Sequence, residues 1–313
     1  MQTNRIDLHM HSFYSDDGEC SPRELVGKCL ESGIKVMAIA DHNSVRANEP
    51  GKEAAGDAGI TYIPAVEIDC TYEGVNFHVL GYGIDYTSPD FAGIEDNISR
   101  QGAAASVKML HATRALGFEV TGEEMAALAG NNYWKDRWTG EMFAEILLDK
   151  TEYKEHPMLM PYRQGGERGD NPYVNFYWDY YSQGRPCYVE MRYPGLGQIV
   201  ETIHGNGGYA VLAHPGVNLK GHEELLRPLI ETGLDGIEAF SSYHSREQAL
   251  DFYNQSRNHN LFYTCGSDYH GKTKPSIYVG QHGCVMPVSY THLKRMAVST
   301  WTAASIWTER AST

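Results

Sequence analysis

Histidine and carboxylate side chains recur at the ends of apolar segments in this 313-residue sequence. Near the N-terminus, His9 and His11 alternate with apolar residues, so both imidazoles point to the same face of a strand expected at residues 5–11. Asp16 follows five positions after the second histidine and can reach back as an oxygen ligand. Because a His-x-His pair alone is weak evidence for a metal site, the remaining segments decide the interpretation.

The other candidate ligands lie at the end of, or within, five further apolar segments. These are residues 35–42 with His42, 60–67 with Glu67, 75–82 with His78, 209–215 with His214, and 261–270 with Asp268 and His270. All but His78 stand at or just after the C-terminal end of a strand, the edge at which barrel active sites form. Nitrogen and oxygen ligands without thiolate suit Zn, Mn or Fe. Nine such ligands predict two or three divalent ions and hydrolytic chemistry.

The segments between these strands have helical patterns. Ser21 is expected to cap a helix that opens with Pro22 and Glu24, and Gly33 is expected to end it. Strands that alternate with helices predict an α/β fold with a parallel sheet, and seven such units predict closure into a (β/α)7 barrel. We assign residues 1–88 and 198–287 to this barrel.

Residues 89–197 interrupt the alternation and predict an inserted, mainly helical subdomain. Helical periodicity covers residues 98–116 and 140–148, and the aromatic content of the rest disfavours a long disordered loop. The insertion leaves and rejoins the barrel at its ligand-bearing end, so we expect it to cap the site. Residues 288–313 lack periodicity and predict a tail that is disordered or non-native.

The composition restricts location and partners. A formal net charge of −14 argues against long nucleic acid and anionic membrane as partners. Six cysteines without a Cys-x-x-Cys pair predict reduced thiols, and no apolar run is long enough for a membrane helix. The first strand leaves no room for a signal peptide. We therefore expect a soluble cytoplasmic protein, and its oligomeric state stays open.

Four motifs in the chain resemble the signatures of the PHP (polymerase and histidinol phosphatase) family. They are residues 7–12 (DLHMHS), 40–43 (ADHN), 213–215 (AHP) and 266–271 (GSDYHG). The resemblance covers residues 5–84 and 198–280, and the position of the insertion is similar to that of stand-alone PHP phosphoesterases acting on nucleotides. It implies a distorted seven-stranded (β/α) barrel with a trinuclear metal site.

The resemblance also implies how the ligands divide among three ions. One ion would take His9, His11, Glu67 and Asp268, and a second would share Glu67 and take His78 and His214. A third would take Asp16, His42 and His270.

Substrate contacts are expected from cations that are not needed as ligands. Arg137, Arg185 and Arg192 lie in the insertion or at its exit and are candidates for holding a phosphate. The nucleotide-acting subgroup often has an Arg-Pro-His stretch that contacts the phosphate, whereas the comparable helix start here reads Arg137-Trp138-Thr139. This departure leaves the substrate open. His244 follows a strand expected at residues 234–240 and is predicted to contact the substrate or protonate the leaving oxygen.

These observations predict a metal-dependent phosphoesterase that hydrolyses a phosphate monoester of a nucleotide or another small metabolite with a metal-activated hydroxide. One alternative is an exonuclease or phosphodiesterase acting on short oligonucleotides. Another is a non-catalytic PHP-like module, which should have lost several of the nine ligands. An amidohydrolase is a further alternative, but no lysine closes any ligand-bearing strand in the way that a bridging lysine would require.

Overall fold

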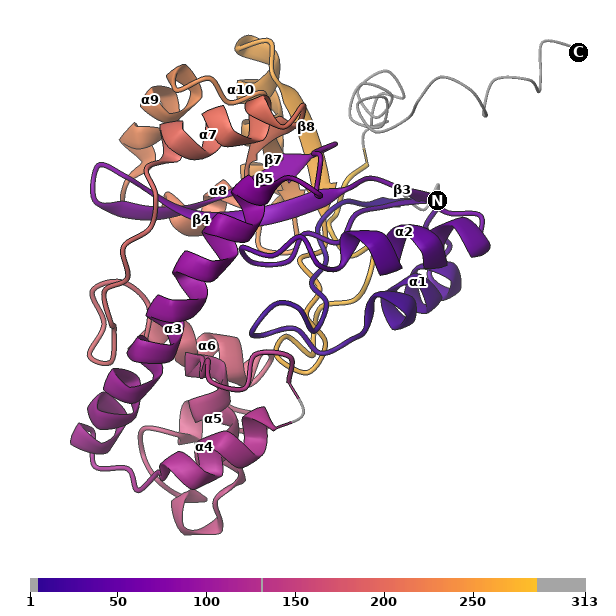
Figure 1. Cartoon of the computed structure of the whole chain (residues 1–313). Coiled ribbons are helices and arrows are strands. Elements are labelled where there is room, and N and C mark those ends of the chain that lie inside the picture. The colour runs from indigo at the N-terminus through magenta and orange to yellow at the C-terminus, as the bar shows by residue number, and fades with distance from the viewer. Residues whose placement is uncertain (1–4, 131, 286–313) are drawn as a thin grey trace, which may run out of the picture.

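The computed structural model describes residues 5–130 and 132–285. Figure 1 shows an α/β part that contains both ends of the described chain and a helical part, with the long helix α3 (Pro89–Ala115) running from one to the other. No helix in the described part of the chain is long and apolar enough to cross a bilayer. The predicted tail at residues 288–313 lies outside the described residues.

Within the described residues, eight strands form two sheets. The strands are β1 (Ile6–Asp7), β2 (Val36–Met37), β3 (Thr61–Tyr62), β4 (Ala65–Tyr72), β5 (Val75–Tyr82), β6 (Tyr209–Leu212), β7 (Gly236–Ser241) and β8 (Phe262–Gly266). The first sheet has the order β1-β2-β3 and is parallel, and the second has the order β4-β5-β6-β7-β8. In the second sheet, β5 runs antiparallel to both of its neighbours, β4 and β6.

The two sheets approach each other without forming one continuous closed sheet. β8 lies beside β1, where the Leu8 backbone N–H donates to the Cys265 carbonyl at 3.1 Å. Beyond them, Met10 and Tyr269 form an isolated parallel bridge. The α/β architecture is therefore as expected, whereas the closed (β/α)7 barrel is not confirmed and the antiparallel β5 departs from a strand–helix repeat.

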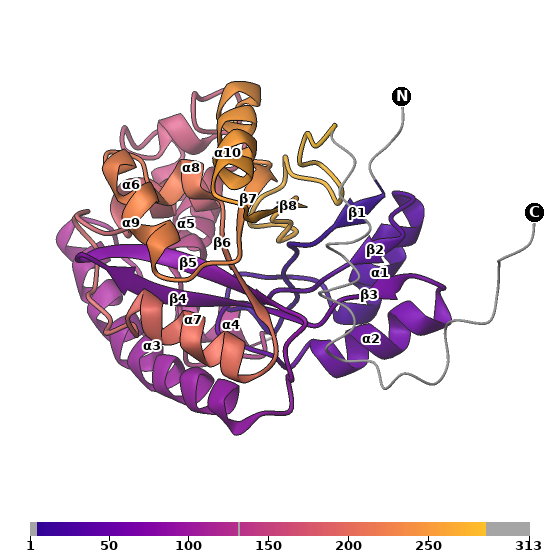
Figure 2. The same cartoon turned by 90° about the horizontal axis from the view of Figure 1, so that it is seen from above.

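Helices cover the outer faces of both sheets. They are α1 (Pro22–Glu31), α2 (Asn48–Asp57), α7 (Leu196–Gly205), α8 (Pro215–Asn218), α9 (Leu226–Glu231) and α10 (Arg246–Asn258), with a 3-10 turn at Glu223–Leu225. Figure 2 shows α1 and α2 beside β1–β3 on one side, and α8–α10 on the other. The capping box predicted at Ser21 and Glu24 is present at the start of α1.

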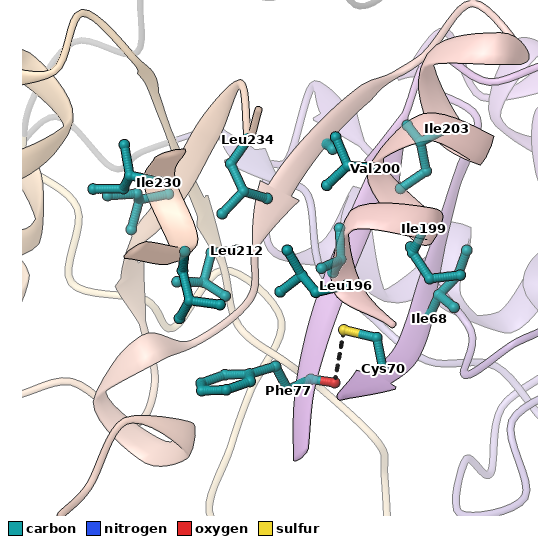
Figure 3. Packing of buried hydrophobic residues seen from close by; sticks show 14 of the residues in the cluster. Ile68, Cys70, Phe77, Leu196, Ile199, Val200, Ile203, Leu212, Ile230 and Leu234 are labelled. Carbon is teal, nitrogen blue, oxygen red and sulfur yellow. Dashed lines mark hydrogen bonds between the residues drawn. The ribbon is translucent and has the colours of Figure 1, made fainter. Parts of the chain in front are cut away.

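Apolar side chains join the layers. Ile199 and Val200 of α7 and Ile230 of α9 pack with Ile68 and Leu212 of the five-stranded sheet (Figure 3). A second buried group fills the space between the sheets beneath the strand ends: Leu8, Ala38, Ile63, Ala65, Leu80, Tyr82, Val211 and Ala213. These two groups fix the strands that carry the candidate ligands.

The insertion contains α3, α4 (Gly122–Ala129), α5 (Gly140–Asp149), α6 (Pro172–Tyr180) and 3-10 turns at Thr151–Tyr153 and Met160–Tyr162. It has a buried apolar cluster of its own, which includes Phe118, Phe143, Leu147 and Phe176. α3 and α5 fall in the segments where periodicity predicted helices, whereas α6 lies in a stretch noted only as aromatic. The predicted domain limits stay a prediction.

Candidate metal centre

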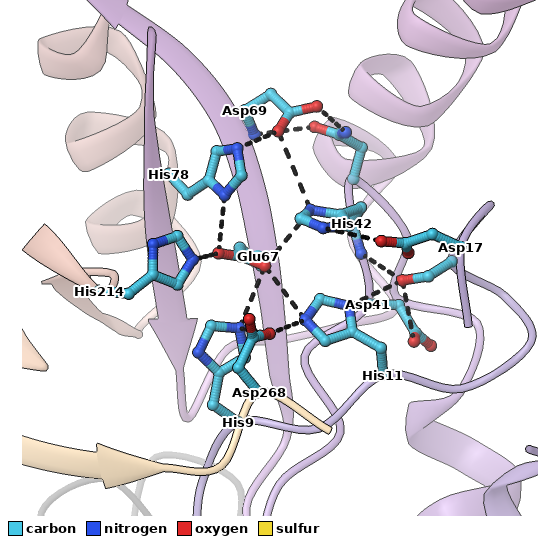
Figure 4. Close-up of polar contacts among 12 residues, drawn as sticks. His9, His11, Asp17, Asp41, His42, Glu67, Asp69, His78, His214 and Asp268 are labelled. Atoms are coloured by element: carbon cyan, nitrogen blue, oxygen red, sulfur yellow. Dashed lines mark hydrogen bonds and ion pairs between the residues drawn. The ribbon is translucent and has the colours of Figure 1, made fainter. Parts of the chain in front are cut away.

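Glu67 of β4 lies at the centre of a ring of histidines (Figure 4). Its side chain has no exposed surface, and its two oxygens face different groups. Oε1 lies 3.0 Å from His78 Nδ1 and 2.8 Å from His214 Nε2. Oε2 lies 3.1 Å from His9 Nε2, 3.2 Å from His11 Nε2 and 3.3 Å from His42 Nδ1. A carboxylate in this position is suited to bridging two cations.

The β4–β5 hairpin supplies three of the clustered side chains. Glu67 and Asp69 are two residues apart on β4, so both side chains point to the same face of the sheet. His78 is the direct partner of Asp69 across the antiparallel pair, with Nε2 3.0 Å from Asp69 Oδ1. Asp69 was not among the predicted ligands, although its spacing from Glu67 was the signal that could have identified it.

Three residues at the site have backbone conformations that are rare for side-chain-bearing residues. The φ angles are 55° at Asn43, 22° at His214 and 56° at Asp268. Each is held by hydrogen bonds inside the site; for example, the Asp268 N–H donates to the His9 carbonyl at 2.7 Å and the His214 N–H donates to Glu238 Oε2 at 2.8 Å. Such strain persists only where the surroundings enforce it, and it is concentrated at functional sites.

The potential ligand atoms form four groups in which all atoms lie within 4.8 Å of one another. The groups are His9, His11, Glu67 and Asp268; Glu67, His78 and His214; His11, Asp17, His42 and His270; and His42, Asp69 and His78. Eight of the nine predicted ligands occur in these groups. The first two groups have the membership that the family resemblance implied.

The chemistry of these residues fits divalent metal ions. Five buried ligand atoms have no hydrogen-bond partner within residues 5–130 and 132–285: His11 Nε2, His42 Nδ1, His270 Nε2, Asp17 Oδ1 and Asp268 Oδ1. All five belong to residues of the four groups. A buried polar atom without a partner is costly, and a cation among these nitrogen and oxygen atoms would remove that cost.

The protonation states of His11 and Glu67 suit a metal site. His9 would have to lose a proton when a cation binds, because burial, which alone would lower its pKa, is outweighed by Glu67 and Glu238, which raise the pKa well above the usual value. Burial lowers the pKa of His11 to about 4, and the neighbouring His270 adds to this effect, so His11 is neutral at pH 7 with a lone pair to donate. Burial alone would raise the pKa of Glu67, but the charges of His9 and His42 bring it well below its usual value. Glu67 is therefore an ionised carboxylate.

Second-layer carboxylates orient two of the histidines. Glu238 Oε1 lies 3.0 Å from His9 Nδ1, on the side of the ring away from Glu67. Ser15 Oγ lies 2.9 Å from His11 Nδ1 and donates to Asp41 Oδ1 at 3.3 Å. Both carboxylates are buried. Glu238 lies within β7 and Asp41 lies in the segment after β2, and nothing in the sequence distinguished them from ordinary polar residues.

The structure corrects the prediction for Asp16. Asp17 is the residue that lies in the cluster, with Oδ2 3.1 Å from His270 Nε2. Asp16 forms an ion pair with Arg137 of the insertion instead. In this turn the two carboxylates point in different directions, and only that of Asp17 faces the histidines.

The predicted substrate-binding arginines lie in different surroundings. Arg137 is buried, pairs with Asp16 and lies over the ring of Trp134 at 5.0 Å. Arg185 and Arg192 are exposed. The structure therefore places one of the three next to the cluster loop, and the phosphate-binding role of all three stays a prediction.

His244 has both ring nitrogens on backbone groups. Nδ1 lies 2.9 Å from the Ala239 carbonyl, which requires Nδ1–H to donate, and Nε2 accepts from the Gly216 N–H at 3.0 Å. Burial also lowers its pKa. In this conformation His244 fastens the turn after His214 and has no nitrogen free to exchange a proton with a substrate.

Lys274 is a buried cation that sequence reasoning missed. Its Nζ lies 2.6 Å from Asp268 Oδ2, and the residue is 5% exposed. Burial alone would lower its pKa, but the charge of Asp268 raises the pKa above the usual lysine value. The residue lies in a loop rather than at a strand end, so strand periodicity could not identify it.

A cavity of about 210 Å³ adjoins the cluster at Asp17, between the first loop and the insertion. Its charged lining residues are Asp16, Asp17, Glu19, Glu141, Glu145 and Lys272. Lys272 pairs with Glu145 at 2.8 Å, which links the loop after β8 to α5. The insertion thus forms one wall of the space beside the cluster.

Residues 7–159 match the family model described as the PHP domain. The chain contains a PHP domain. The resemblance drawn from the four motifs is therefore confirmed, and the histidines of the first motif lie within the matched residues.

Two enzymes align with this chain along most of their own length. A 5'-3' exoribonuclease of Haemophilus influenzae is 27% identical over 271 residues, covering 86% of this chain and 90% of the relative. A 3',5'-nucleoside bisphosphate phosphatase of Chromobacterium violaceum is 28% identical over 286 residues, covering 90% and 93%. Both names denote hydrolysis of phosphoric esters.

A solved structure from Chromobacterium violaceum, described as an amidohydrolase with bound sulfate and no metal, has the same fold. The TM-score is 0.77 at 24% sequence identity, and the match covers 94% of this chain and 96% of the other. This similarity supports the α/β architecture.

Proposed function

We propose that this PHP-domain protein is a metal-dependent phosphoric ester hydrolase acting on a nucleotide or another small phosphorylated substrate. The observation that carries the proposal is Glu67, a buried carboxylate whose two oxygens face two histidine groups. The arrangement favours two cations held a short distance apart, which is the setting for in-line displacement at phosphorus. The names of the two curated relatives support the reaction class.

Two to three divalent ions, of Zn, Mn or Fe, would be held by the clustered residues. The ligands in this proposal are His9, His11, Asp17, His42, Glu67, His78, His214, Asp268 and His270, with Asp69 as an additional ligand. When bound, such ions would supply Lewis acidity that lowers the pKa of water and stabilises negative charge on a phosphoryl group.

The protein's own contribution in this proposal is positioning. Glu238 and Ser15 fix the rings of His9 and His11, so that Nε2 of each ring faces the cluster without rearrangement. The apolar group beneath the strand ends holds the ligand-bearing backbone in place. Phosphoryl transfer depends mainly on such positioning and on electrostatic stabilisation.

The cavity beside Asp17 limits the size of a substrate bound there, and its carboxylate lining would need the proposed cations to accept a phosphate. Its volume of about 210 Å³ is below the roughly 300–1,000 Å³ typical of pockets for drug-sized ligands. Contacts such as Trp134 Nε1–H to the Tyr14 carbonyl and Ser276 N–H to Asn171 Oδ1 join the insertion to the first loop and to the loop after β8. A long duplex would also have to approach a chain of net charge −14.

A second candidate function is exonucleolytic or phosphodiester cleavage of short oligonucleotides. It is favoured by the Haemophilus influenzae relative, which aligns along most of both chains and is named an exoribonuclease. The test compares hydrolysis rates of a nucleoside monophosphate, a 3',5'-bisphosphate, a dinucleotide and a long oligonucleotide by metal-replete protein. The monoester reading expects the small monoesters to be fastest. A faster oligonucleotide would favour the nuclease, and no hydrolysis of any ester would favour a non-catalytic module.

A further inference from the structure

The carboxylate of Asp268 faces two environments with its two oxygens. Oδ1 lies 3.0 Å from His11 Nε2 and 3.4 Å from His9 Nε2, and it has no hydrogen-bond partner in the described part of the chain. Oδ2 lies 2.6 Å from Nζ of Lys274. The carboxylate is therefore oriented, with one oxygen occupied by the lysine and the other turned toward the histidines.

Lys274 is itself held in place on several sides. Its Nζ lies 5.0 Å from the centre of the Tyr243 ring, and its backbone N–H donates to the Gly271 carbonyl at 3.1 Å. The adjacent Thr273 donates its hydroxyl to the Asp17 carbonyl at 2.7 Å. A buried lysine in a fixed loop has already lost its rotamer freedom on folding, so no further ordering is needed when a ligand binds.

Lys274 also offsets repulsion among carboxylates. The two groups that contain His11 hold three carboxylates, those of Asp17, Glu67 and Asp268. Repulsion among them would favour rotation of Asp268 away from the cluster. A cation on Oδ2 opposes that rotation without occupying the oxygen that faces His9 and His11.

We propose that Lys274 is a positioning residue that holds Asp268 ready to ligate an ion in the group formed with His9, His11 and Glu67. The inference rests on the proposed metal-dependent function but concerns ion binding rather than substrate choice. It assigns to a loop lysine the second-layer role that Glu238 has toward His9. Second-layer partners of this kind contribute about 10–100-fold to metal affinity or activity.

The test measures Zn²⁺ stoichiometry and affinity of the full chain by competition with a chromogenic chelator. Lys274→Met should weaken one ion by about 10–100-fold and leave the remaining ions bound as in the wild type. Lys274→Arg keeps a charged donor and should recover most of the loss. Lys272→Met is the matched control, because that lysine lies in the same loop but pairs with Glu145 outside the four groups, and its ion affinities should be unchanged.

Unchanged or tighter binding of every ion by a folded Lys274→Met variant would overturn the proposal, because the lysine would then be neutral or a competitor for Asp268. Lys274→Gln is the second variant if the methionine leaves Asp268 too poorly satisfied to fold. Its amide keeps one donor, so an intermediate loss of affinity is expected, and wild-type affinity would again contradict the role. Failure of the proposed function is distinguishable, because a wild-type protein that binds its ions but hydrolyses no phosphoester leaves this affinity result intact.

Discussion

Nδ1 of His9 lies 3.0 Å from Oε1 of Glu238, and neither side chain has any exposed surface. A carboxylate oxygen accepts a hydrogen bond from Nδ1–H, so Nε2 is the ring nitrogen that can lose its proton and bind a cation in the cluster. The other oxygen of Glu238 accepts the N–H of His214 at 2.8 Å. One glutamate thus fixes the ring of one candidate ligand and the strained backbone of another.

Replacing this glutamate should weaken the site without dismantling it. In Glu238→Gln, the amide oxygen can accept from only one of the two donors, His9 Nδ1–H and the His214 N–H, while the amide NH₂ faces the other donor. The ring of His9 is then held less firmly. We expect metal affinity and phosphoesterase activity to fall by about 10–100-fold. Metal titration and steady-state rates check this. The matched control is Glu95→Gln, a buried glutamate paired with Arg46, which should change stability more than metal affinity.

Glu67→Gln should have a larger effect, because the change removes the charge that faces two histidine groups. We expect loss of at least one ion and a fall in activity of about 10³-fold or more, which corresponds to roughly 4 kcal/mol of lost transition-state stabilisation.

His78→Ala should lose ions while the chain stays folded. Elemental analysis, rates and circular dichroism test both variants. Wild-type turnover by both would refute the assignment, and unfolding of His78→Ala would identify a core histidine.

The neighbouring aspartates provide a comparison within one turn. Asp17→Asn should reduce metal binding at the group with His42 and His270 and lower activity strongly. Asp16→Asn should leave the ion count unchanged and instead weaken the attachment of Arg137. Counting bound ions in the two variants separates the roles. Equal ion loss in both would mean that the turn rearranges when metals bind.

This pair of residues shows where sequence reasoning reached its limit. Strand periodicity located His9, Glu67 and His214 because a strand end fixes which way a side chain points. A loop has no such periodicity, so the choice between Asp16 and Asp17 could not be made from spacing. The same reason explains why Lys274 was missed.

The fold was predicted in part for a related reason. The cap of α1 depends on local chemistry at Ser21 and was predicted correctly. The stretch at residues 60–67 was expected as one strand, but Pro64 separates β3 from β4, since proline cannot donate a ladder hydrogen bond. The antiparallel direction of β5 depends on tertiary pairing and has no simple periodic signature.

Glu141 of α5 should make stability depend on pH. Burial raises its pKa from 4.5 to about 8, and the charge of Asp17 adds to the shift. The folded chain therefore holds this proton where the unfolded chain has lost it, so the contribution of Glu141 to stability falls as the pH rises from 4.5 to about 8.

Glu141→Gln removes this contribution. The free energy of unfolding of the variant relative to the wild type should increase through that interval, by at most about 1.4 kcal/mol per pH unit, and level off above it. Urea titrations across the interval measure the difference, with Glu145→Gln of the same helix as the control. A difference that does not vary with pH would show that Glu141 is ionised throughout.

The contact between β1 and β8 has a consequence for how the protein is made. The Leu8 N–H donates to the Cys265 carbonyl, and the Asp268 N–H donates to the His9 carbonyl, so these N-terminal residues pair with residues more than 250 positions later in the chain. The ribosome must synthesise the chain through Asp268 before these contacts can form. The complete set of proposed ligands would therefore be available to ions only after that point, and a chain truncated before Asp268 would offer them an incomplete set.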